Sequence, residues 1–468
     1  MRAMRLMGWV LGWATLLGTA GCTVDPGFMD GQPCTPDGSC ATGYTCVAEP
    51  CGEGYMCPVC RRQPAARDGG PDGGDADGGG DAGGDGGDGA VSCDQTPPDC
   101  LSLPDCQPVE PECIEGVWVC DTGYEPTERS CDGLDNDCDG QTDAGLVCPL
   151  AGDTQPGLID GTGRQARFDR PSGLLALPSG ALLVADSGNH AIRQVAADGT
   201  TTTLAGNGES GWQDGNGAQA RFRKPTALAM AADGRVLVAD QDNHRIRLLS
   251  VDGQVTTLAG SGFTGSSDGP ALEARFAFPA GVITDAGGAV LVADTGNHCL
   301  RRIAAGQVEV FAGRCGFPGL ADGAADQARF NRPHDLLLLA DGSLAVSEES
   351  SHRIRLVAAD GQVSTLAGDG QFGWRDGSLA EARFANPAGL AAAGAGTLWL
   401  ADAGNHRIRL LDLQADAVTS PIGAGVAGAA DGPPALVELH RPAGVALTAA
   451  GRLVIADTEN HLLRVYEP

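Results

Sequence analysis

Short apolar runs separated by glycine and aspartate turns recur along the chain after residue 145. One such stretch is Leu-Leu-Val-Ala-Asp at 182–186, followed by a polar Ser-Gly-Asn-His and a second apolar run. Histidines of the equivalent stretches occur at 190, 244, 298, 352, 406 and 461, so the period is 54 residues, and 55 at the last step. A period of this length, built of short strands and turns, is typical of propeller blades.

Each unit contains four apolar runs joined by turns, which predicts one four-stranded antiparallel sheet. In the second unit the strands are expected at 225–230, 234–240, 244–249 and 255–260. No Leu-Ala-Gly run follows the sixth unit, whereas an unmatched copy stands at 147–151. Pairing that first segment with the last blade removes exposed edges. The sequence therefore predicts an all-β, six-bladed propeller over 145–468, closed by three strands from one end of the chain and one from the other.

The repeated Val-Ala-Asp, followed by Asn-His and then Ile-Arg or Leu-Arg, resembles the signature of NHL repeats in all six units. The resemblance implies a six-bladed propeller used mostly for binding. Some members of that family bind proteins or RNA, some are sensor domains at cell surfaces, and one branch is a metal-dependent amidating lyase. A shared fold does not choose among these functions.

Residues that recur in every unit cannot mark a single active site. The six histidines are therefore interpreted as blade-packing residues that hydrogen-bond neighbouring strands, in preference to metal ligands. The arginines of the recurring Ala-Arg-Phe are expected to pair with aspartates or carbonyl groups between blades. These arginines are Arg167, Arg221, Arg275, Arg329 and Arg383.

The fourth unit departs from the repeat. It has Pro333-His334-Asp335 where other units have proline followed by small residues, and Glu348 and Ser351 replace Asp and Asn. The start of this strand is expected near the central channel, where propellers commonly bind ligands. Basic residues precede the prolines of four units, at Arg170, Lys224, Arg332 and Arg441. Together with His334 and Asp335 they are candidates to bind a carboxylated or sulfated glycan or peptide. The alternative is a degenerate blade with a surface histidine.

The N-terminus has the features of an export signal. Residues 1–21 combine Arg2 and Arg5 with an apolar run and small residues before Cys22, and the apolar run is too short to span a membrane. The ending resembles a bacterial lipoprotein signal, which implies that Cys22 is lipidated and that the protein sits in the cell envelope. The alternative is ordinary cleavage after Ala20 and secretion.

The 17 cysteines indicate an oxidising compartment. A small disulfide-rich module is expected at 22–62, a flexible Gly/Asp-rich linker at 63–92 and a second cysteine-rich module at 93–148. In the propeller, Cys299 and Cys315 flank a hairpin and are expected to form a local disulfide.

An acidic loop lies within the second module. Carboxylates at alternate positions around a glycine make an oxygen-rich loop that suits calcium in a structural role. The segment resembles a cysteine-flanked metal-binding repeat of secreted bacterial proteins, bounded by Cys131 and Cys138. That resemblance implies Asp135, Asp137, Asp139 and Asp143 as ligands, with Asp132 as a further candidate. The alternative is an acidic turn held by the two cysteines.

The formal net charge of −29 repels phosphate backbones, so nucleic acid is not an expected partner. Two functions remain open. The first is an anchored, monomeric propeller that binds a protein, peptide or glycan, without a catalytic cofactor. The second is a propeller enzyme, of the metal-dependent lyase or lactone hydrolase type, with its site at the channel mouth.

Overall fold

The computed structural model describes residues 145–394 and 396–467, together with Cys131 and the backbone of four short strands. The four strands form two antiparallel hairpins, β1 (Tyr44–Pro50) with β2 (Met56–Arg62) and β3 (Glu112–Ile114) with β4 (Val117–Val119). The export signal, Cys22, the linker and the acidic loop 132–143 lie outside the described residues. No helix in the described part of the chain is long and apolar enough to cross a membrane.

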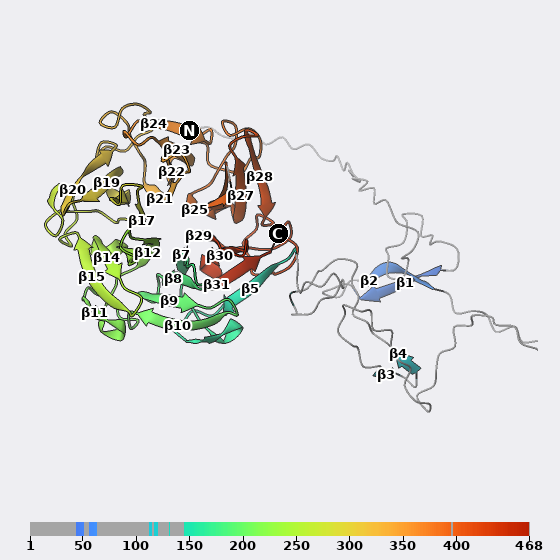
Figure 1. Ribbon diagram of the computed structural model, residues 1–468. Helices are drawn as coiled ribbons and strands as arrows, with labels where there is room; N and C mark the ends of the chain where they lie inside the picture. The colour runs from blue at the N-terminus through green and yellow to red at the C-terminus, as the bar shows by residue number, and fades with distance from the viewer. Residues whose placement is uncertain are drawn as a thin grey trace, which may run out of the picture. The chain divides into compact units, whose positions relative to one another are not determined.

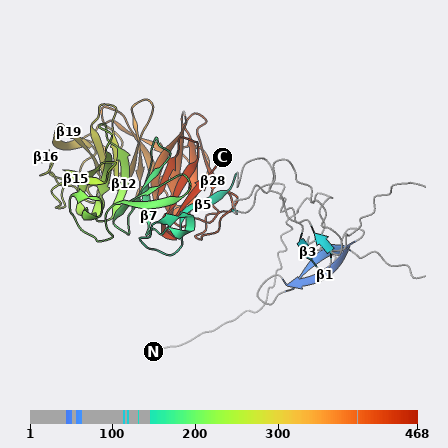
Figure 2. The ribbon, with the colours of Figure 1, turned by 60° about the horizontal axis from the view of Figure 1, so that its bottom comes forward.

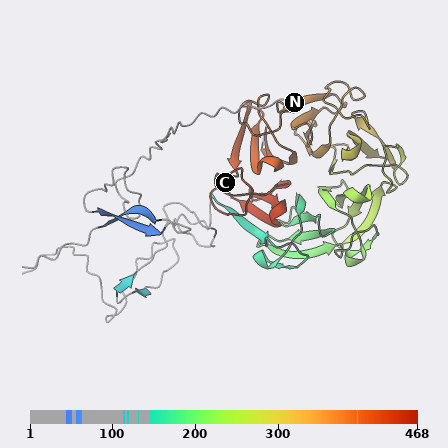
Figure 3. The ribbon, with the colours of Figure 1, turned by 180° about the vertical axis from the view of Figure 1, so that it is seen from behind.

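Six antiparallel sheets form a ring, and the first strand of each lies nearest the centre (Figure 1). The innermost strands are β7 (Pro171–Ala176), β12 (Pro225–Met230), β17 (Gly281–Thr284), β21 (Pro333–Leu338), β25 (Pro387–Gly394) and β29 (Gly444–Leu447). The second strands are β8 (Leu182–Asp186), β13 (Val236–Asp240), β18 (Val290–Asp294), β22 (Leu344–Glu348), β26 (Thr397–Asp402) and β30 (Leu453–Asp457). Figure 2 shows the ring tilted, and Figure 3 shows the same ring of sheets from behind.

The outer half of each blade consists of two further strands. The third strands are β9 (Ala191–Val195), β14 (Arg245–Leu249), β19 (Cys299–Ala304), β23 (Arg353–Val357), β27 (Arg407–Asp412) and β31 (Leu462–Tyr466). The fourth strands of the first five blades are β10 (Thr200–Ala205), β15 (Gln254–Ala259), β20 (Gln307–Ala312), β24 (Val363–Ala367) and β28 (Ala417–Ile422). The short strands β6 (Gly161–Thr162), β11 (Gly215–Asn216) and β16 (Gly269–Pro270) extend the first three sheets.

The sixth blade takes its outer strand from the start of the propeller. Strand β5 (Val147–Gly152) pairs with β31, with Ala151 opposite Leu463 and Cys148 opposite Val465. This is the predicted three-plus-one closure. It joins the first and last blades through a backbone ladder, so the ring has no open seam between them.

Short 3₁₀ turns complete the blades. They are η1 (Gly163–Gln165), η2 (Gly217–Gln219), η3 (Gln241–Asn243), η4 (Thr295–Asn297), η5 (Ala403–Asn405) and η6 (Thr458–Asn460). The last four each end at a repeat histidine in the left-handed conformation. Each of these four turns connects the second strand of its blade to the third.

The hydrophobic core lies between blades and not within any one of them. Each of six apolar clusters combines side chains of two neighbouring blades; one of them joins Leu183 of the first blade to Val238 of the second. Five phenylalanines of the Ala-Arg-Phe segments are completely buried in these seams: Phe168, Phe222, Phe276, Phe330 and Phe384. Blades that share a core cannot unfold independently without exposing a neighbour's apolar surface.

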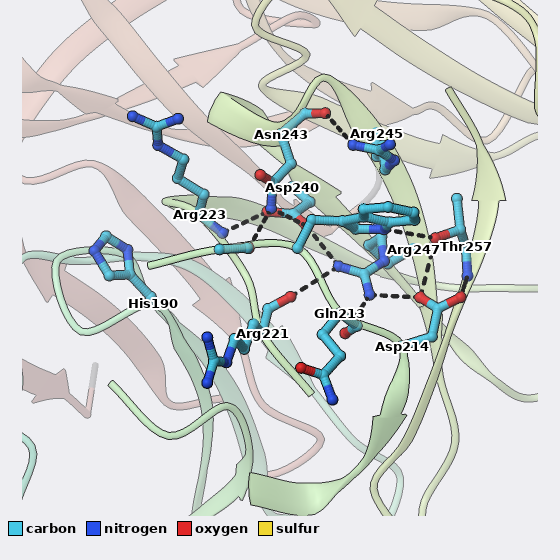
Figure 4. Close-up of polar contacts among 12 residues, drawn as sticks. His190, Gln213, Asp214, Arg221, Arg223, Asp240, Asn243, Arg245, Arg247 and Thr257 are labelled. Atoms are coloured by element: carbon cyan, nitrogen blue, oxygen red, sulfur yellow. Dashed lines mark hydrogen bonds and ion pairs between the residues drawn. The ribbon is translucent and has the colours of Figure 1, made fainter. Parts of the chain in front are cut away.

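A buried arginine in the third strand of every blade organises the polar contacts. In blade two, Arg247 donates from Nη1 to Asp240 Oδ2 (2.6 Å) and from Nη2 to Asp214 Oδ1 (2.6 Å), as Figure 4 shows. It also donates to the carbonyl oxygens of Arg221 and Gln213. The six equivalent arginines, each with no exposed surface, are Arg193, Arg247, Arg301, Arg355, Arg409 and Arg464. Each ties the end of the second strand to the long connection from the preceding blade.

The repeat histidines link neighbouring blades, as expected. His190 Nδ1 accepts the backbone N–H of Lys224 (3.1 Å), and His461 Nδ1 accepts that of Arg170 across the closure (3.1 Å). Equivalent bonds are made by His244, His298, His352 and His406. Because these nitrogens accept a backbone hydrogen, the histidines act as neutral structural groups in this arrangement.

The arginines of Ala-Arg-Phe lie nearer the surface than the buried set. Arg221 pairs with Glu209 (2.6 Å) and Arg383 with Asp369 (2.7 Å), whereas the Arg329 guanidinium lies over the ring of Phe317. The expected pairing with acidic groups is therefore made by some members. Their backbone carbonyls do the more regular work, since they accept hydrogen bonds from the buried arginines.

Two disulfides are present among the described cysteines. Cys299 is bonded to Cys315 across the β19–β20 hairpin, with 5.0 Å between the Cα atoms, as predicted. Cys131 is bonded to Cys148, with 5.6 Å between the Cα atoms. The expected pairing of Cys131 with Cys138 is therefore wrong, because Cys131 is already bonded to Cys148 and a sulfur forms only one disulfide bond.

Candidate functional site

The channel mouth is a polar cavity of about 450 Å³ at the beginning of the innermost strands. Its wall is made mainly of three kinds of residue. They are the residue before the inner-strand proline in five of the blades, the residue after that proline in five of the blades, and the turn that follows the second strand in all six. The volume lies in the range of roughly 300–1,000 Å³ that small-molecule sites occupy.

Left-handed backbone corners place the basic residues at this mouth. Arg170, Lys224, Arg332 and Arg441 all have φ between 50° and 57°, and all line the cavity. A positive φ is costly for residues other than glycine. Each of these corners is held by the bond from its own N–H to the histidine of the preceding blade. The chain thus turns sharply into the inner strand and leaves the long basic side chain exposed at the mouth.

Three acidic residues share the mouth with the four basic ones: Asp242, Glu349 and Glu459. Arg332 Nε donates to Glu349 Oε2 at 2.8 Å, and Arg170 is 3.4 Å from Asp169. Lys224 and Arg441 form no ion pair with any described residue. Two cations are therefore available to a ligand in a protein that is strongly acidic as a whole.

The neighbouring charges of the mouth shift the pKa of Glu349. Burial acts to raise the pKa of its carboxyl, but the hydrogen bond from Arg332 and the charges of His334 and Arg441 outweigh it and lower the pKa below its usual value. Glu349 is therefore ionised at neutral pH. His334, Arg441 and Glu349 all line the same cavity.

His334 lies at the inner end of the mouth, where it lines this cavity and the next one along the channel. The equivalent positions in the other blades carry Ser172, Thr226, Ala280, Ala388 and Ala443. His334 is half-buried, and its Nδ1 is a buried nitrogen without a hydrogen-bond partner among the described residues. Burial, with Arg332 and Lys224 nearby, lowers the pKa of His334 despite the carboxylates of Asp335 and Glu349.

Asp335 makes hydrogen bonds that stabilise the propeller. Its Oδ2 accepts the N–H of Leu390 in the next inner strand at 2.8 Å, and its own N–H donates to Ser347 Oγ at 3.0 Å. Burial raises its pKa, against the opposing effects of the Leu390 N–H and of His334. Because its carboxylate is engaged by a backbone N–H and no hydrogen bond joins it to His334, the two residues do not form a histidine–carboxylate dyad.

A second, apolar cavity of about 510 Å³ continues along the inner strands. It shares four lining residues with the mouth: Ser172, Thr226, His334 and Ala443. Further along the strands its wall contains one half-buried or exposed apolar side chain from each blade: Leu175, Met230, Ile283, Leu337, Ala392 and Leu447. The channel therefore changes from charged to apolar along its length.

All six channel residues expected from the sequence come together here. Arg170, Lys224, Arg332, Arg441 and His334 line the mouth, and Asp335 lines the lower cavity. His334 is thus not a residue of the outer surface. The three acidic residues of the mouth were missed. The signal that could have found them is the variation, from unit to unit, of the two residues between Asp and Asn-His.

The other expected site residues are not brought into this region. Within the described residues no group of three or more His, Cys, Asp or Glu side chains is placed to hold a metal ion. The predicted calcium ligands Asp132, Asp135, Asp137, Asp139 and Asp143 lie outside those residues, as does the predicted lipidation site.

The NHL repeat matches this chain at residues 168–195, 222–247, 276–303, 384–409 and 439–466. The propeller carries NHL repeats. Each matched segment covers the first two strands and all or part of the third strand of one blade in these NHL repeats. Blade four is the one blade without a match, which agrees with its departures at the channel and in the second strand.

Two curated proteins resemble the NHL propeller in sequence. The chain is 33% identical over 280 residues to SUPPRESSOR OF QUENCHING 1 of Arabidopsis thaliana, covering 56% of this chain and 26% of that protein. It is 27% identical over 333 residues to the NHL repeat-containing protein 2 of Gallus gallus, covering 61% and 44%. The chain thus spans less than half the length of either relative.

Solved structures share the fold. A Bacteroides thetaiotaomicron protein of unknown function has a TM-score of 0.55 at 20% identity, covering 69% of this chain and 75% of its own. An auxiliary nutrient binding protein from the same organism has a TM-score of 0.54 at 16% identity, covering 68% and 75%. At these identities the likeness concerns the fold.

Proposed function

We propose that this NHL propeller is a binding module that takes an anionic ligand at the channel mouth. The observation that carries the proposal is the pair of cations, Lys224 and Arg441, that line the cavity and form no ion pair within the described part of the chain. A carboxylate or sulfate placed between them accepts charge-assisted hydrogen bonds, which are the stronger kind. That one of the similar folds is an auxiliary nutrient binding protein is in keeping with this function.

The rest of the mouth supports selection of an anion. Glu349 fixes Arg332 in place, so that guanidinium presents its remaining N–H groups in a defined direction. Asp242 and Glu459 repel ligands whose negative charge extends over the whole channel mouth. A compact anionic group attached to a carboxylated or sulfated glycan or peptide fits this pattern better than an extended polyanion.

Titration calorimetry of the full chain tests the proposal. Glutarate and a fluorescein-labelled sulfated oligosaccharide serve as probes, the latter also by fluorescence anisotropy. Replacing Lys224→Met or Arg441→Gln is expected to weaken binding by about tenfold or more each, since a hydrogen bond to a charged group contributes ~1.5–3 kcal/mol.

Arg235→Gln is the matched control. Arg235 pairs with Asp233 in the β12–β13 hairpin, away from the mouth. It should leave the affinity unchanged. If neither probe binds at low salt, or if the control variant weakens binding as much as Lys224→Met, the mouth is not the binding site.

We further propose that the protein is exported and anchored through lipidated Cys22, and that Asp132, Asp135, Asp137, Asp139 and Asp143 hold a structural calcium ion. The motifs at 1–22 and 131–143 support these roles. Mass spectrometry of the full chain is expected to show bound calcium that is lost in Asp135→Asn/Asp137→Asn. Cys22→Ser should move the protein from the detergent phase to the aqueous phase. A chain that keeps its calcium, or its partitioning, in these variants contradicts the respective role.

A further inference from the structure

The two cavities of the channel have opposite character and meet at one ring of residues. Above that ring lie Lys224 and Arg441, which form no ion pair with a described residue, and below it the wall is mainly apolar. The residues that line both cavities are serine, threonine, alanine and one histidine. A ligand that enters the mouth by its charged group therefore meets an apolar chamber directly beneath.

The lower chamber has the properties of an apolar binding site. Its volume of about 510 Å³ is within the range of roughly 300–1,000 Å³ of small-molecule pockets. Leu175, Ile283, Leu337 and Leu447 border it while remaining only half-buried. Apolar side chains that stay accessible inside a concavity gain free energy when a ligand covers them.

Two polar side chains of the lower chamber already have hydrogen-bond partners. Asp335 Oδ2 accepts the Leu390 N–H, and Thr284 Oγ1 donates to the carbonyl oxygen of Met230 at 2.7 Å. These bonds reduce the number of polar groups that a ligand has to satisfy, which favours a hydrocarbon tail beyond His334.

We infer that the channel binds an amphiphile with a single anionic head group: the head lies between Lys224 and Arg441, and an unbranched apolar tail passes His334 into the chamber bordered by Leu175, Leu337 and Ala392. The inference rests on the proposed function, because it uses the same mouth, and it names the ligand class. Charge complementarity selects the anionic head, and the continuity of the two cavities selects an attached tail.

His334 sets the shape of the passage. It is the bulkiest side chain of the ring, where every other blade has a hydroxyl or a methyl group. The imidazole stands on one side of a ring of otherwise small side chains, so it takes up space beside a ligand that passes. A straight alkyl chain has a smaller cross-section than a sugar or an aromatic ring, and it is the tail for which we infer passage.

Calorimetry with the sodium salts of hexanoic, octanoic, decanoic and dodecanoic acids, each below its micellar concentration, tests the inference on the full chain. Affinity is expected to increase about fourfold for each added methylene, the equivalent of ~0.8 kcal/mol per buried CH₂. The increase should stop when the tail fills the chamber. Decanol, with the same tail but no charge, is expected to bind at least tenfold more weakly than decanoate.

Ala392→Phe tests the location. Ala392 is exposed to the chamber, so a larger side chain there occupies the space of the tail without disturbing a packed core. The variant should bind hexanoate and dodecanoate with equal affinity. Val251→Phe is the control, because Val251 is 84% exposed in a hairpin turn away from the channel and should keep the chain-length dependence.

The possible outcomes separate the two proposals. Binding of glutarate and all four acids without any chain-length dependence overturns the amphiphile and leaves the anionic mouth standing. A chain-length dependence that persists in Ala392→Phe places the tail elsewhere and overturns the inference too. Absence of binding by every carboxylate, glutarate included, overturns the proposed function together with it.

Discussion

Blades two and four solve the same packing problem with different residues. In blade two, Asp240 Oδ2 accepts hydrogen bonds from Asn243 (2.9 Å) and Arg247 (2.6 Å). In blade four, Glu348 Oε2 accepts them from Ser351 (2.7 Å) and Arg355 (3.0 Å). Glutamate is one methylene longer than aspartate and serine is shorter than asparagine, so the exchange at one position compensates for the other.

The same comparison singles out His334. Glu348 and Ser351 depart from the repeat yet rebuild its hydrogen bonds, and Asp335 finds a partner in the next strand. His334 Nδ1 has none among the described residues. A departure from a repeat is therefore not by itself a sign of function. The informative departure is the one that the scaffold does not compensate.

The largest expected effect follows from removing a buried carboxylate. Asp240→Ala leaves Arg247 buried with half of its ionic partners and is expected to destabilise the fold by ~3–5 kcal/mol. Glu348→Ala in blade four should cost as much, because Arg355 is equally inaccessible. Urea unfolding measures both. A clearly smaller loss of unfolding free energy for Glu348→Ala than for Asp240→Ala would show that blade four is a degenerate blade. The two blades would then not be equivalent.

Blade three offers a covalent counterpart of a contact in blade two. Arg245 Nη2 donates to the carbonyl oxygen of Ser261 (2.8 Å). In blade three Cys299 stands at the position of Arg245, and it is bonded to Cys315, the counterpart of Gly262. Cys299→Ser/Cys315→Ser is expected to lose ~3 kcal/mol, the chain-entropy value for a loop of about 15 residues.

The variant Cys299→Arg/Cys315→Ser sharpens that test. It places an arginine at the position of Arg245, within reach of the carbonyl oxygen of Arg314, the counterpart of Ser261, so it should recover about 1 kcal/mol of the loss by donating to that carbonyl. Thermal unfolding under oxidising conditions measures the difference. Equal stability of the two double variants would mean that the two bridges are not equivalent.

A double-mutant cycle tests the compensation within blade four. Glu348→Asp alone is expected to cost ~1–2 kcal/mol, since the shortened carboxylate cannot reach both Ser351 and Arg355. Ser351→Asn alone should cost a similar amount by crowding the longer glutamate. The double variant restores the arrangement of blade two and should be nearly as stable as the natural chain. Additive losses would show that the two positions are independent.

The smallest effect concerns pH. Burial lowers the pKa of His190, His244, His298, His352 and His406 below the usual value. The folded state then binds fewer protons than the unfolded state, so the stability from these groups is present above pH ~6.5 and is lost as pH falls through the folded-state pKa values.

Burial raises the pKa of Asp186 and Asp294 to about 6, and this acts in the opposite direction over the same range. The contribution of one histidine is therefore obtained by comparing the natural chain with a variant that lacks that histidine. His190→Asn keeps an acceptor and a residue that tolerates the left-handed conformation but does not titrate. Its unfolding free energy should fall less than that of the natural chain between pH 7 and pH 5. Parallel pH curves would contradict a titrating role for His190.

Much of the propeller could be read from the residue pattern. The expected strands of the second unit at 225–230 and 255–260 match β12 and β15 to within one residue. The pairing of β5 with β31 and the histidine contacts between blades also follow from the repeat, because each is a consequence of closing identical units into a ring.

The buried arginines could not be read in this way. Arg193 and Arg247 stand at polar positions of an alternating strand, which ordinarily face water. In the folded protein the polar face of each blade packs on its neighbour, so both side chains lose all exposed surface. The acidic residues of the mouth were missed for a related reason, since Asp242 and Glu349 belong to turns whose common orientation depends on the ring.

The sequence by itself determined the number of blades, their order, the closure and the positions at which one blade differs from the rest. Periodic hydrophobicity and turn residues are local properties, so they can be recognised in the sequence alone. Only the tertiary structure decided which of these differences share a space. Lys224, His334 and Arg441 are separated by more than a hundred residues in each case, and it is the curvature of the ring that brings them around one channel.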